Sequence, residues 1–504
     1  MSLPDISFNY GKGGLGRGLT GSDFISSFLF VNSSLPSGFG SSDRIKKIFS
    51  LADAVALGID NTYSDETKAT ATVTVTNKGA IGDVVTVNYT DYNGTVIQLA
   101  QYTLATGDVT STTTSATAMV TAINLGTNVH GFSATSSVAV VTITTKVGEG
   151  IYPNSGTPYA VTNTGTFAST VAQAVVSGVA SKRIIEYYHI SEFFRLQPQG
   201  VLYVAYYSSF SASNIELVRD YANGTIRQFG LFHDFSTAFA TGQVTSIQAV
   251  ATSSESLHKP FSVLYAPEIS GTTSLSSLVD LTGLASKNVS VVISQDGGYF
   301  GYKLWKTTGK SISDLGAKLG VVSLSLVSES IAWVGKFNMS DGNELDTVAF
   351  SNGVTYSSAS ASLLNNLNNY GYLFLRKLVD VTGSYNTPPT TATLPSSDYH
   401  FIHSNRTIDK AVRGVRVDLI NDLSSPLTLN SDGTLTSGLI AHFESQASIG
   451  LNQMVRNGEL SNFSVTVDPA QNVLTNNTLT VAIKLLPIGV ADFITVNIGF
   501  TTNI

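Results

Sequence analysis

Cysteine is absent from the 504 residues of this chain, and charged residues make up only 12% of them. Without cysteine, the chain can form neither disulfide bonds nor thiolate metal sites. No apolar run is long enough to cross a bilayer as a helix, so we expect no membrane insertion. The first residues hold no basic stretch followed by an apolar one, which predicts no Sec-type export and assembly in the cytoplasm.

Basic residues are also scarce. The formal net charge is -7, and no basic run exceeds the pair Lys46 and Lys47. A nucleic-acid-binding protein would carry a basic face, so we expect no nucleic-acid partner. The charged share is about half of the usual ~25%, which predicts that partners cover much of the surface. The alternative is a surface solvated by Ser and Thr hydroxyls, and residues 67–172 at least favour it.

Motifs of enzymes and metal sites are present only in part. Residues 307–311 (TTGKS) resemble the end of a P-loop, but Leu304 stands where that motif requires glycine, so we interpret them as a capped helix start. Residues 339–346 begin like a calcium loop but lack its later ligands. His400 and His403, the closest histidine pair, would point to opposite faces of a strand. We therefore predict no catalytic residue, cofactor or metal, and no enzymatic activity.

The two ends of the body are bounded by flexible stretches. Residues 1–22 read as an arm, because alternating apolar residues are followed by a glycine-rich hinge. The strand residues are Ile6, Phe8 and Tyr10, and the hinge glycines are Gly11, Gly13, Gly14 and Gly16. Such a strand needs a sheet supplied from outside its own body.

The middle of the chain contains two different sequence patterns. Residues 67–172 consist of short Thr/Val runs separated by turn signals such as Asn93-Gly94, which predicts an inserted all-β domain, a sandwich or small barrel. Residues 23–66 and 173–385 form a discontinuous central α/β domain, with a sheet that is at least partly parallel and covered on both faces. Its predicted helices lie near residues 181–195, 214–222, 241–256 and 275–285. Residues 386–397 read as a stiff Pro/Thr linker.

Residues 398–486 predict an α+β domain. An arginine-bearing helix at 405–420 precedes a long amphipathic helix at 437–458 and two alternating strands at 462–468 and 478–487. The long helix has apolar residues at intervals of three and four, and Gly458 stands where a left-handed cap would end it. The apolar residues of the helix are Leu439, Phe443, Ala447, Gly450 and Met454.

The chain ends in a second predicted arm at 487–504. Its strand alternates through Ile494, Val496, Ile498 and Phe500. The break at Pro487 and Gly489 acts as a hinge that lets this strand leave its own domain.

This order of elements resembles the C-terminal domain of contractile tail sheath proteins, from phage tails and related injection machines. The residues that carry the resemblance are Gly458, Leu460, Phe463, Val465, Val467, Asp468 and Asn472, followed by 479–487 and 494–500. Residues 43–59 and 182–207 resemble two further segments of that family, which are near neighbours there. Because more than a hundred residues separate them here, we interpret 67–172 as an insertion that decorates the outer surface.

The resemblance implies a structural subunit that forms helical rings around a tail tube. The strands at 3–10 and 492–504 would each add to sheets in adjacent copies, and contraction would drive the tube through a target envelope, as in bacteriophage genome ejection. The implied partners are other copies of the chain, the tail tube protein, and baseplate and tail terminator proteins. The implied location is a virion tail or a contractile injection particle.

The resemblance also assigns roles within the C-terminal domain. From the residues alone, the polar side of the helix at 437–458 could be an ordinary solvated face. The resemblance implies instead that this helix lines the inner wall of the sheath and contacts the tube through His442, Glu444, Ser445, Gln446 and Gln453. Four basic residues, Arg406, Lys410, Arg413 and Arg416, share one side of the preceding helix. They would form ion pairs with a neighbouring subunit or face water.

A surface adhesin or tail-fibre-like binding protein is the alternative function. The Ser/Thr-rich β insertion and the absence of cysteine favour it. It predicts trimers or monomers, an export signal or fibre repeats, and the sequence has no repeat at a fixed period.

Overall fold

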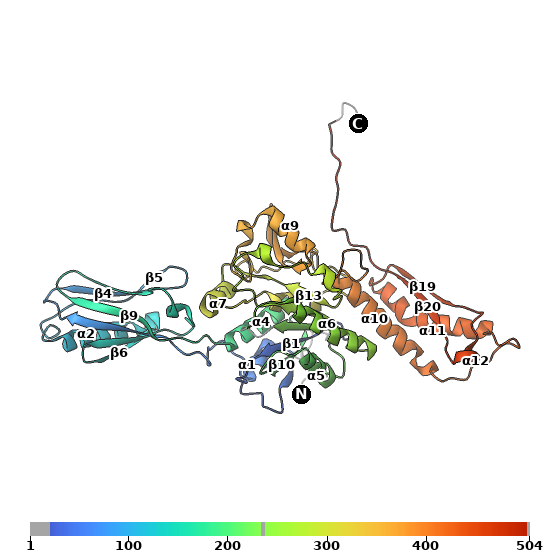
Figure 1. Cartoon of the computed structure of the whole chain (residues 1–504), viewed down its shortest axis with the longest axis horizontal. Coiled ribbons are helices and arrows are strands. Elements are labelled where there is room, and N and C mark those ends of the chain that lie inside the picture. The colour runs from blue at the N-terminus through green and yellow to red at the C-terminus, as the bar shows by residue number, and fades with distance from the viewer. Residues whose placement is uncertain (1–20, 233–236, 501–504) are drawn as a thin grey trace, which may run out of the picture.

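A seven-stranded sheet forms the centre of the molecule in the computed structural model, which describes residues 21–232 and 237–500 (Figure 1). In order across the sheet, the strands are β16 (Tyr372–Leu373), β13 (Val289–Val292), β12 (Ser262–Ala266), β11 (Gln228–Phe232), β1 (Ile25–Val31), β10 (Val201–Tyr207) and β2 (Ile45–Ile48). All neighbours pair in parallel except β2, which runs antiparallel to β10 at one edge. The five central residues of β1 are buried, as expected for a strand covered on both faces.

Helices cover both faces of this sheet. The helices α4 (Arg183–Leu196) and α8 (Leu315–Leu324) pack in the apolar core on one face, together with α1 (Leu51–Ala56). The helices α5 (Ser213–Tyr221) and α6 (Thr241–Ser256) pack on the other face. The predicted parallel sheet between helices is confirmed, as are three of its four predicted helices.

The helix predicted at 275–285 is wrong. Two short 3-10 turns, Leu275–Ser277 and Thr282–Leu284, stand there instead, and Ala285 takes a left-handed φ of 52°. Leu275, Leu278 and Leu281 are buried. The extended backbone at Leu278, with a ψ of 134°, separates the two turns, so no continuous helix forms.

Shorter elements complete the central body. These are α7 (Phe300–Thr308), α9 (Ala361–Asn369), η4 (Tyr356–Ser358), and the paired strands β14 (Ser294–Asp296) with β15 (Val348–Phe350) and β17 (Leu375–Leu378) with β18 (Val381–Asn386). Residues 307–311 do not start a helix as predicted, because α7 ends at Thr308 and Gly309 closes it with a φ of 63°. His403 lies in a helix rather than in a strand.

The predicted linker at 386–397 is packed into the central body. Thr390, Thr391, Ala392 and Thr393 are buried, and bridges join Ala392 to Ser286 and Thr390 to Phe401. The Thr391 hydroxyl and the Thr390 carbonyl have hydrogen-bond partners there. A segment with the composition of a linker is therefore part of the packed interior.

The insertion projects from one end of the body (Figure 1, left). Its two sheets contain β6 (Ser133–Ser137), β7 (Val140–Thr144), β3 (Thr70–Asn77) and β9 (Ala168–Val176) in one, and β5 (Val96–Thr103), β4 (Val84–Thr90) and β8 (Tyr159–Asn163) in the other. A bridge between Thr67 and Val179 forms its neck. Its strands therefore continue past the predicted boundary at residue 172.

The insertion is not all-β as predicted. It also contains α2 (Thr112–Leu125), the short α3 (Thr127–His130) and η1 (Tyr152–Asn154). Ser111 caps α2 in a reciprocal pair with Thr114, and Ala116, Met119 and Ile123 are buried in the core between the sheets. Their spacing of three and four was the signal for a helix, but the many threonines around it resembled the neighbouring strands.

Candidate functional site

Two crossing helices build the C-terminal domain. The helix α10 (Ile402–Leu419) continues into the turn η5 (Ile420–Asp422), and α11 (Ser437–Arg456) packs against it (Figure 1, right). The helices approach closely at Gly414 and Gly450, because a Cβ on Gly450 would lie 3.2 Å from the Gly414 Cα. The Asp418 carboxylate accepts a hydrogen bond of 2.8 Å from the Gly450 backbone N–H at this crossing.

The helix α11 begins and ends where the sequence predicts. The Thr436 side chain accepts a hydrogen bond from the Leu439 backbone N–H, and Gly458 has a φ of 73° two residues after the last helical one. Its buried residues are Phe443, Ala447, Leu451 and Met454. This stripe packs against a sheet, so the opposite side of the helix is left open.

That sheet has only two strands among the described residues, β19 (Asn462–Val467) and β20 (Val481–Leu486), joined through the short α12 (Val473–Asn476). They pair antiparallel with Val465 opposite Ile483. Alternate residues of both strands contact the helices, as the period of two predicts. Each strand therefore has one partner and one outer edge with no strand beside it within the described residues.

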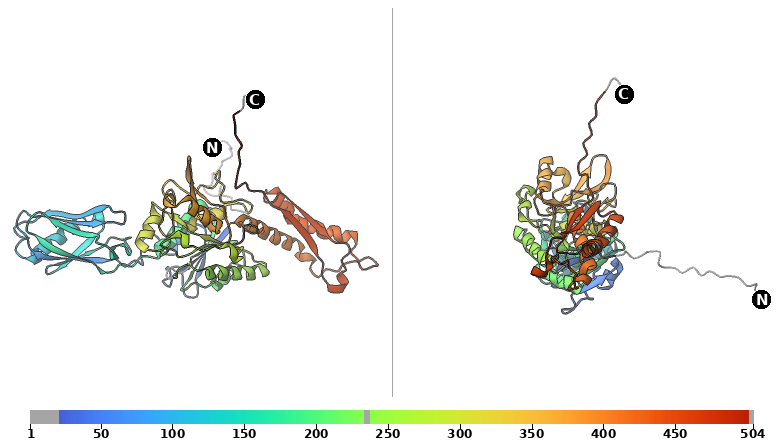
Figure 2. Two further views of the ribbon diagram at one scale, coloured as in Figure 1. Left: turned by 45° about the horizontal axis from the view of Figure 1, so that its top comes forward. Right: turned by 90° about the vertical axis from the view of Figure 1, so that its right-hand side faces the viewer.

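The chain leaves this sheet at Pro487, whose carbonyl accepts a hydrogen bond from the Ser461 hydroxyl. The chain then passes over the central body at residues 488–494, and beyond them it extends away from the body in both views of Figure 2. Residues 487–500 pair with no strand of the described chain, so the predicted last strand is not assigned as one. The apolar side chains beyond Asp492 are at least 75% exposed, and they are Phe493, Ile494, Val496, Ile498 and Phe500.

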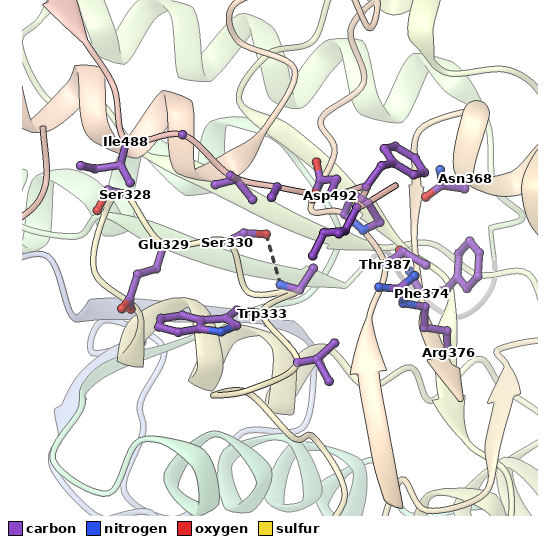
Figure 3. Close-up of a pocket in the computed structure, with 18 of the residues that line it drawn as sticks. Ser328, Glu329, Ser330, Trp333, Asn368, Phe374, Arg376, Thr387, Ile488 and Asp492 are labelled. Atoms are coloured by element: carbon purple, nitrogen blue, oxygen red, sulfur yellow. Dashed lines mark hydrogen bonds between the residues drawn. The ribbon is translucent and has the colours of Figure 1, made fainter. Parts of the chain in front are cut away.

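A groove of about 1030 Å³ lies where this arm crosses the central body (Figure 3). Ile488 and Asp492 of the arm line it together with Trp333, Asn368 and Arg376 of the body. Burial raises the pKa of Asp492, and the charge of Arg376 opposes that rise. The base of the arm thus rests on the body, whereas its apolar residues beyond Asp492 are open to water.

The predicted arm at the other end cannot be placed. Its strand residues and hinge glycines, Ile6, Phe8, Tyr10, Gly11, Gly13, Gly14 and Gly16, lie outside the described residues. The hinges at Pro487 and Gly489 are within them, and their role stays a prediction.

Most of the residues predicted to face the tube lie on the open side of α11. His442 is half-exposed and pairs with Asp422 at 2.9 Å. Ser445 and Gln453 are exposed, and Gln446 is half-buried at the margin. The open face also contains three residues that the prediction missed, Ile449, Asn452 and Arg456.

Glu444 is not on this open face. Its carboxylate accepts a hydrogen bond of 3.0 Å from the backbone N–H of Val467, so it points to the sheet. Its charge predicted a solvated position, but the carboxylate instead accepts a hydrogen bond from the last backbone N–H of strand β19. Ile449 was missed for the opposite reason, because it is apolar and yet 51% exposed.

The predicted contact of Arg406 with a neighbouring subunit or with water is wrong, because this side chain is buried inside its own chain. It is 4% exposed. It donates hydrogen bonds to the Ser325 hydroxyl at 2.7 Å and carbonyl at 3.2 Å, and to the Leu326 carbonyl at 3.3 Å. It therefore anchors α10 on the central body.

Two of the other three basic residues on α10 also have partners within the chain. Lys410 forms ion pairs with Asp23 at 2.7 Å and with Glu459 at 2.5 Å, and Arg413 pairs with Asp23 at 2.7 Å. Arg416 is exposed, and no described residue forms an ion pair with it. Of the four predicted inter-subunit charges, only Arg416 is available for a partner.

A buried carboxyl group, that of Asp409, lies on the same helix. Burial raises the pKa of Asp409 to about 7; the charge of Glu255 adds to the rise, and Arg413, Lys287 and Arg227 oppose it. An unfolded aspartate titrates near a pKa of about 3.9. The folded protein therefore keeps a proton between about pH 4 and 7 that the unfolded chain has lost, so the resulting stability is full below pH 4 and is lost as the pH rises through 7.

Replacing Asp409 by Asn is expected to stabilise the protein at alkaline pH. The neutral amide removes a buried negative charge, so the free energy of unfolding should rise by up to about 4 kcal/mol at pH 8. It should change little at pH 4, where Asp409 is already neutral. Urea unfolding at both pH values measures this difference, with Asp398→Asn as an exposed control. An equal effect of Asp409→Asn at both pH values would contradict the burial of a titrating group.

Neither a metal centre nor a membrane span is apparent in the described part of the chain. It contains no group of three His, Asp or Glu residues placed to hold a metal ion. Within it, no helix combines the length and the apolar character that a membrane span requires.

The fold defines a multidomain α+β protein whose described chain ends in an exposed apolar segment. The chain belongs to the DUF2586 family. The model of the DUF2586 N-terminal domain matches residues 3–388, and the model of the DUF2586 C-terminal domain matches residues 398–504. No curated protein matches the chain.

Three solved structures resemble the chain at 11–13% sequence identity. A chain from the cryo-EM structure of the anti-feeding prophage baseplate is 11% identical, with a TM-score of 0.48, and the match covers 99% of this chain and 100% of that one. The sheath complex of an extracellular contractile injection system, in the contracted state, gives 13% identity and a TM-score of 0.42 over 63% and 80%. The sheath tail protein of Desulfitobacterium hafniense gives 11% identity and a TM-score of 0.36 over 96% and 100%. The last two of these structures are of sheath proteins.

Proposed function

We propose that the chain is a subunit of a contractile tail sheath, and that copies polymerise through their terminal arms. One observation carries this proposal. Residues 487–500 present alternating apolar side chains to water from a domain whose two-stranded sheet has open edges. A lone apolar strand and an open sheet edge complement each other, because pairing satisfies backbone groups and buries side chains on both.

Repetition of this contact would build the sheath. The arm of one copy adds to the sheet of the next, which is a head-to-tail contact and generates rings or helices. The N-terminal arm would make a second link of the same kind. The open face of α11, with His442, Ser445 and Gln453, would then contact a tube on the inside.

Contraction of such an assembly needs no bound nucleotide or other energy-supplying ligand. Copies assemble in an extended arrangement and release free energy as they repack into wider rings. The segments around Gly11 to Gly16 and Pro487 to Gly489 would act as hinges, so the bodies rotate while their strands stay paired. Baseplate and terminator proteins would close the two ends of the polymer.

Negative-stain microscopy of the purified full chain tests the proposal. Hollow, striated cylinders are the expected result. Monomers or trimers that stay dispersed at every concentration would contradict it and favour the adhesin-like alternative.

Removing the insertion is expected to leave assembly intact. Thr67 and Val179 exchange backbone hydrogen bonds of 3.0 and 2.9 Å at its neck, so residues 68–178 can be replaced by a short glycine turn. Cylinders of normal length should form, because the arms and the C-terminal domain are unchanged. Microscopy measures this, and loss of cylinders from a folded variant would show that the insertion takes part in assembly.

A further inference from the structure

One residue joins the start of the described chain to the C-terminal domain. The two carboxylate oxygens of Asp23 form separate ion pairs, with Arg413 and Lys410, each at 2.7 Å. The Asp23 carbonyl accepts hydrogen bonds from Gln228 at 3.2 Å and from Arg406 at 3.5 Å. Three basic residues on one side of α10 therefore converge on a residue that is almost four hundred positions earlier in the chain.

The contact extends beyond α10. Lys410 also pairs with Glu459, and the backbone N–H of Glu459 bonds to the Met454 carbonyl at the end of α11. Lys410, itself on α10, thus also connects Asp23 to the end of α11.

The residues beside Asp23 are held by the central body. The Ser22 hydroxyl accepts a hydrogen bond of 3.0 Å from Arg227, and the Phe24 carbonyl accepts one of 2.7 Å from Ser323. Strand β1 starts at Ile25, in the interior of the seven-stranded sheet. The turn at residues 22–24 is therefore fixed to the central body and to the C-terminal domain at the same point.

The charge balance of this cluster depends on Asp23. Arg406, Lys410 and Arg413 bring three positive charges into a largely buried space, opposed at short range by Asp23 and Glu459. Burial by itself would raise the pKa of Asp23, but the ion pairs outweigh it and lower that pKa, so the carboxylate is charged at neutral pH. Removing this charge leaves Arg413 without an ion-pair partner in the described chain and leaves Lys410 with Glu459 alone, which costs more than an exposed ion pair is worth.

We propose that Asp23 is a mechanical clamp, which transmits a pull on the N-terminal segment directly to α10 and the C-terminal domain. This inference rests on the proposed function, in which a neighbouring copy holds the N-terminal segment. Without the clamp, the pull reaches the C-terminal domain only through the central sheet and the remaining contacts of α10. With it, the points where the two arms leave the body belong to one rigid unit. A displacement of one copy is then passed to the next without movement between the central body and the C-terminal domain.

Single-molecule pulling on the monomer tests the clamp. Because the chain lacks cysteine, handles attach only where cysteines are introduced. One pair of handles, Ser2→Cys with Ser445→Cys, pulls the N-terminus against α11, and a second pair, Ser2→Cys with Ser209→Cys, pulls it against the central body. Ser445 and Ser209 are both exposed.

Asp23→Asn is expected to lower the force of the first rupture about twofold when the N-terminus is pulled against α11, and to leave it unchanged when the N-terminus is pulled against the central body. The rupture force depends on the unfolding barrier, and the ion pairs of Asp23 contribute to that barrier only in the first case. Asp23→Glu should restore the force, since it keeps the carboxylate, and Asp398→Asn should have no effect. Arg413→Gln provides a second route to the same loss. An unchanged force in Asp23→Asn, or an equal drop along both directions, would overturn the clamp. The measurement uses monomers, so a failure of the clamp is separate from a failure of the wild-type chain to form cylinders.

Discussion

A variant that ends at Ala491 is expected to fold like the full chain and to form no cylinders. Only the first removed residues, Asp492 to Ile494, line the groove on the central body, and the removed apolar side chains in the described chain are at least 75% exposed, so the free energy of unfolding should change by less than about 0.5 kcal/mol. Assembly should be lost, because each copy then has an open sheet edge but no strand to add to its neighbour. Thermal unfolding and negative-stain microscopy of the same sample measure both outcomes.

Point variants refine this prediction within the arm. Ile494→Ser with Ile498→Ser removes two apolar side chains from one face of the strand, and each buried isoleucine is worth about 1.5–3 kcal/mol. Thr495→Ser with Asn497→Ser changes the opposite face and is the matched control. The first pair should raise the protein concentration needed for assembly by at least about a hundredfold, and the second should leave it nearly unchanged. Normal cylinders from the shortened chain would refute the role of the arm.

Arg406→Met is expected to destabilise the monomer strongly. The guanidinium is buried and donates to Ser325 and Leu326, so its removal leaves their buried oxygens without a donor and costs about 3–5 kcal/mol. Its loss should release α10 from the central body first. Urea unfolding gives the total, and hydrogen exchange along residues 402–416 shows where protection is lost.

Arg416→Met is the control for this change. Arg416 lies on the same helix but is exposed, without an ion pair in the described chain. Its replacement should alter monomer stability by less than about 0.5 kcal/mol. If Arg406→Met were equally harmless in the monomer and harmful only to cylinders, the arginine would act between subunits, as the sequence suggested.

Local features of the C-terminal domain could be predicted from the sequence. The spacing of Phe443, Ala447, Leu451 and Met454 places them on one side of α11, and Gly458 ends it by adopting the left-handed conformation that glycine favours. The strands β19 and β20 follow from alternation alone. Periodicity succeeds here because it reports how the backbone turns relative to a nearby apolar surface.

The same reasoning failed where polar residues are buried or form hydrogen bonds inside the protein. Residues 390–393 have the composition of a linker but are buried, because their backbone groups bond to Ser286, Val289 and Ser290 of the central body. Glu444 has the character of a surface residue but bonds to the backbone of β19. A residue type tells what a side chain can bond to, whereas the fold decides whether that partner is present.

The sequence by itself determined the order of the elements, the long C-terminal helix, the alternating strands and an apolar end that no part of the chain needs for its own core. Only the tertiary structure decided that Arg406, Lys410 and Arg413 serve their own subunit. Asp23 and Arg413 are 390 positions apart, and nothing in the local pattern of either segment records that they meet. Apolar patterns are visible in sequence because burial repeats with the geometry of each element, but the pairing of distant charges depends on how the finished elements pack.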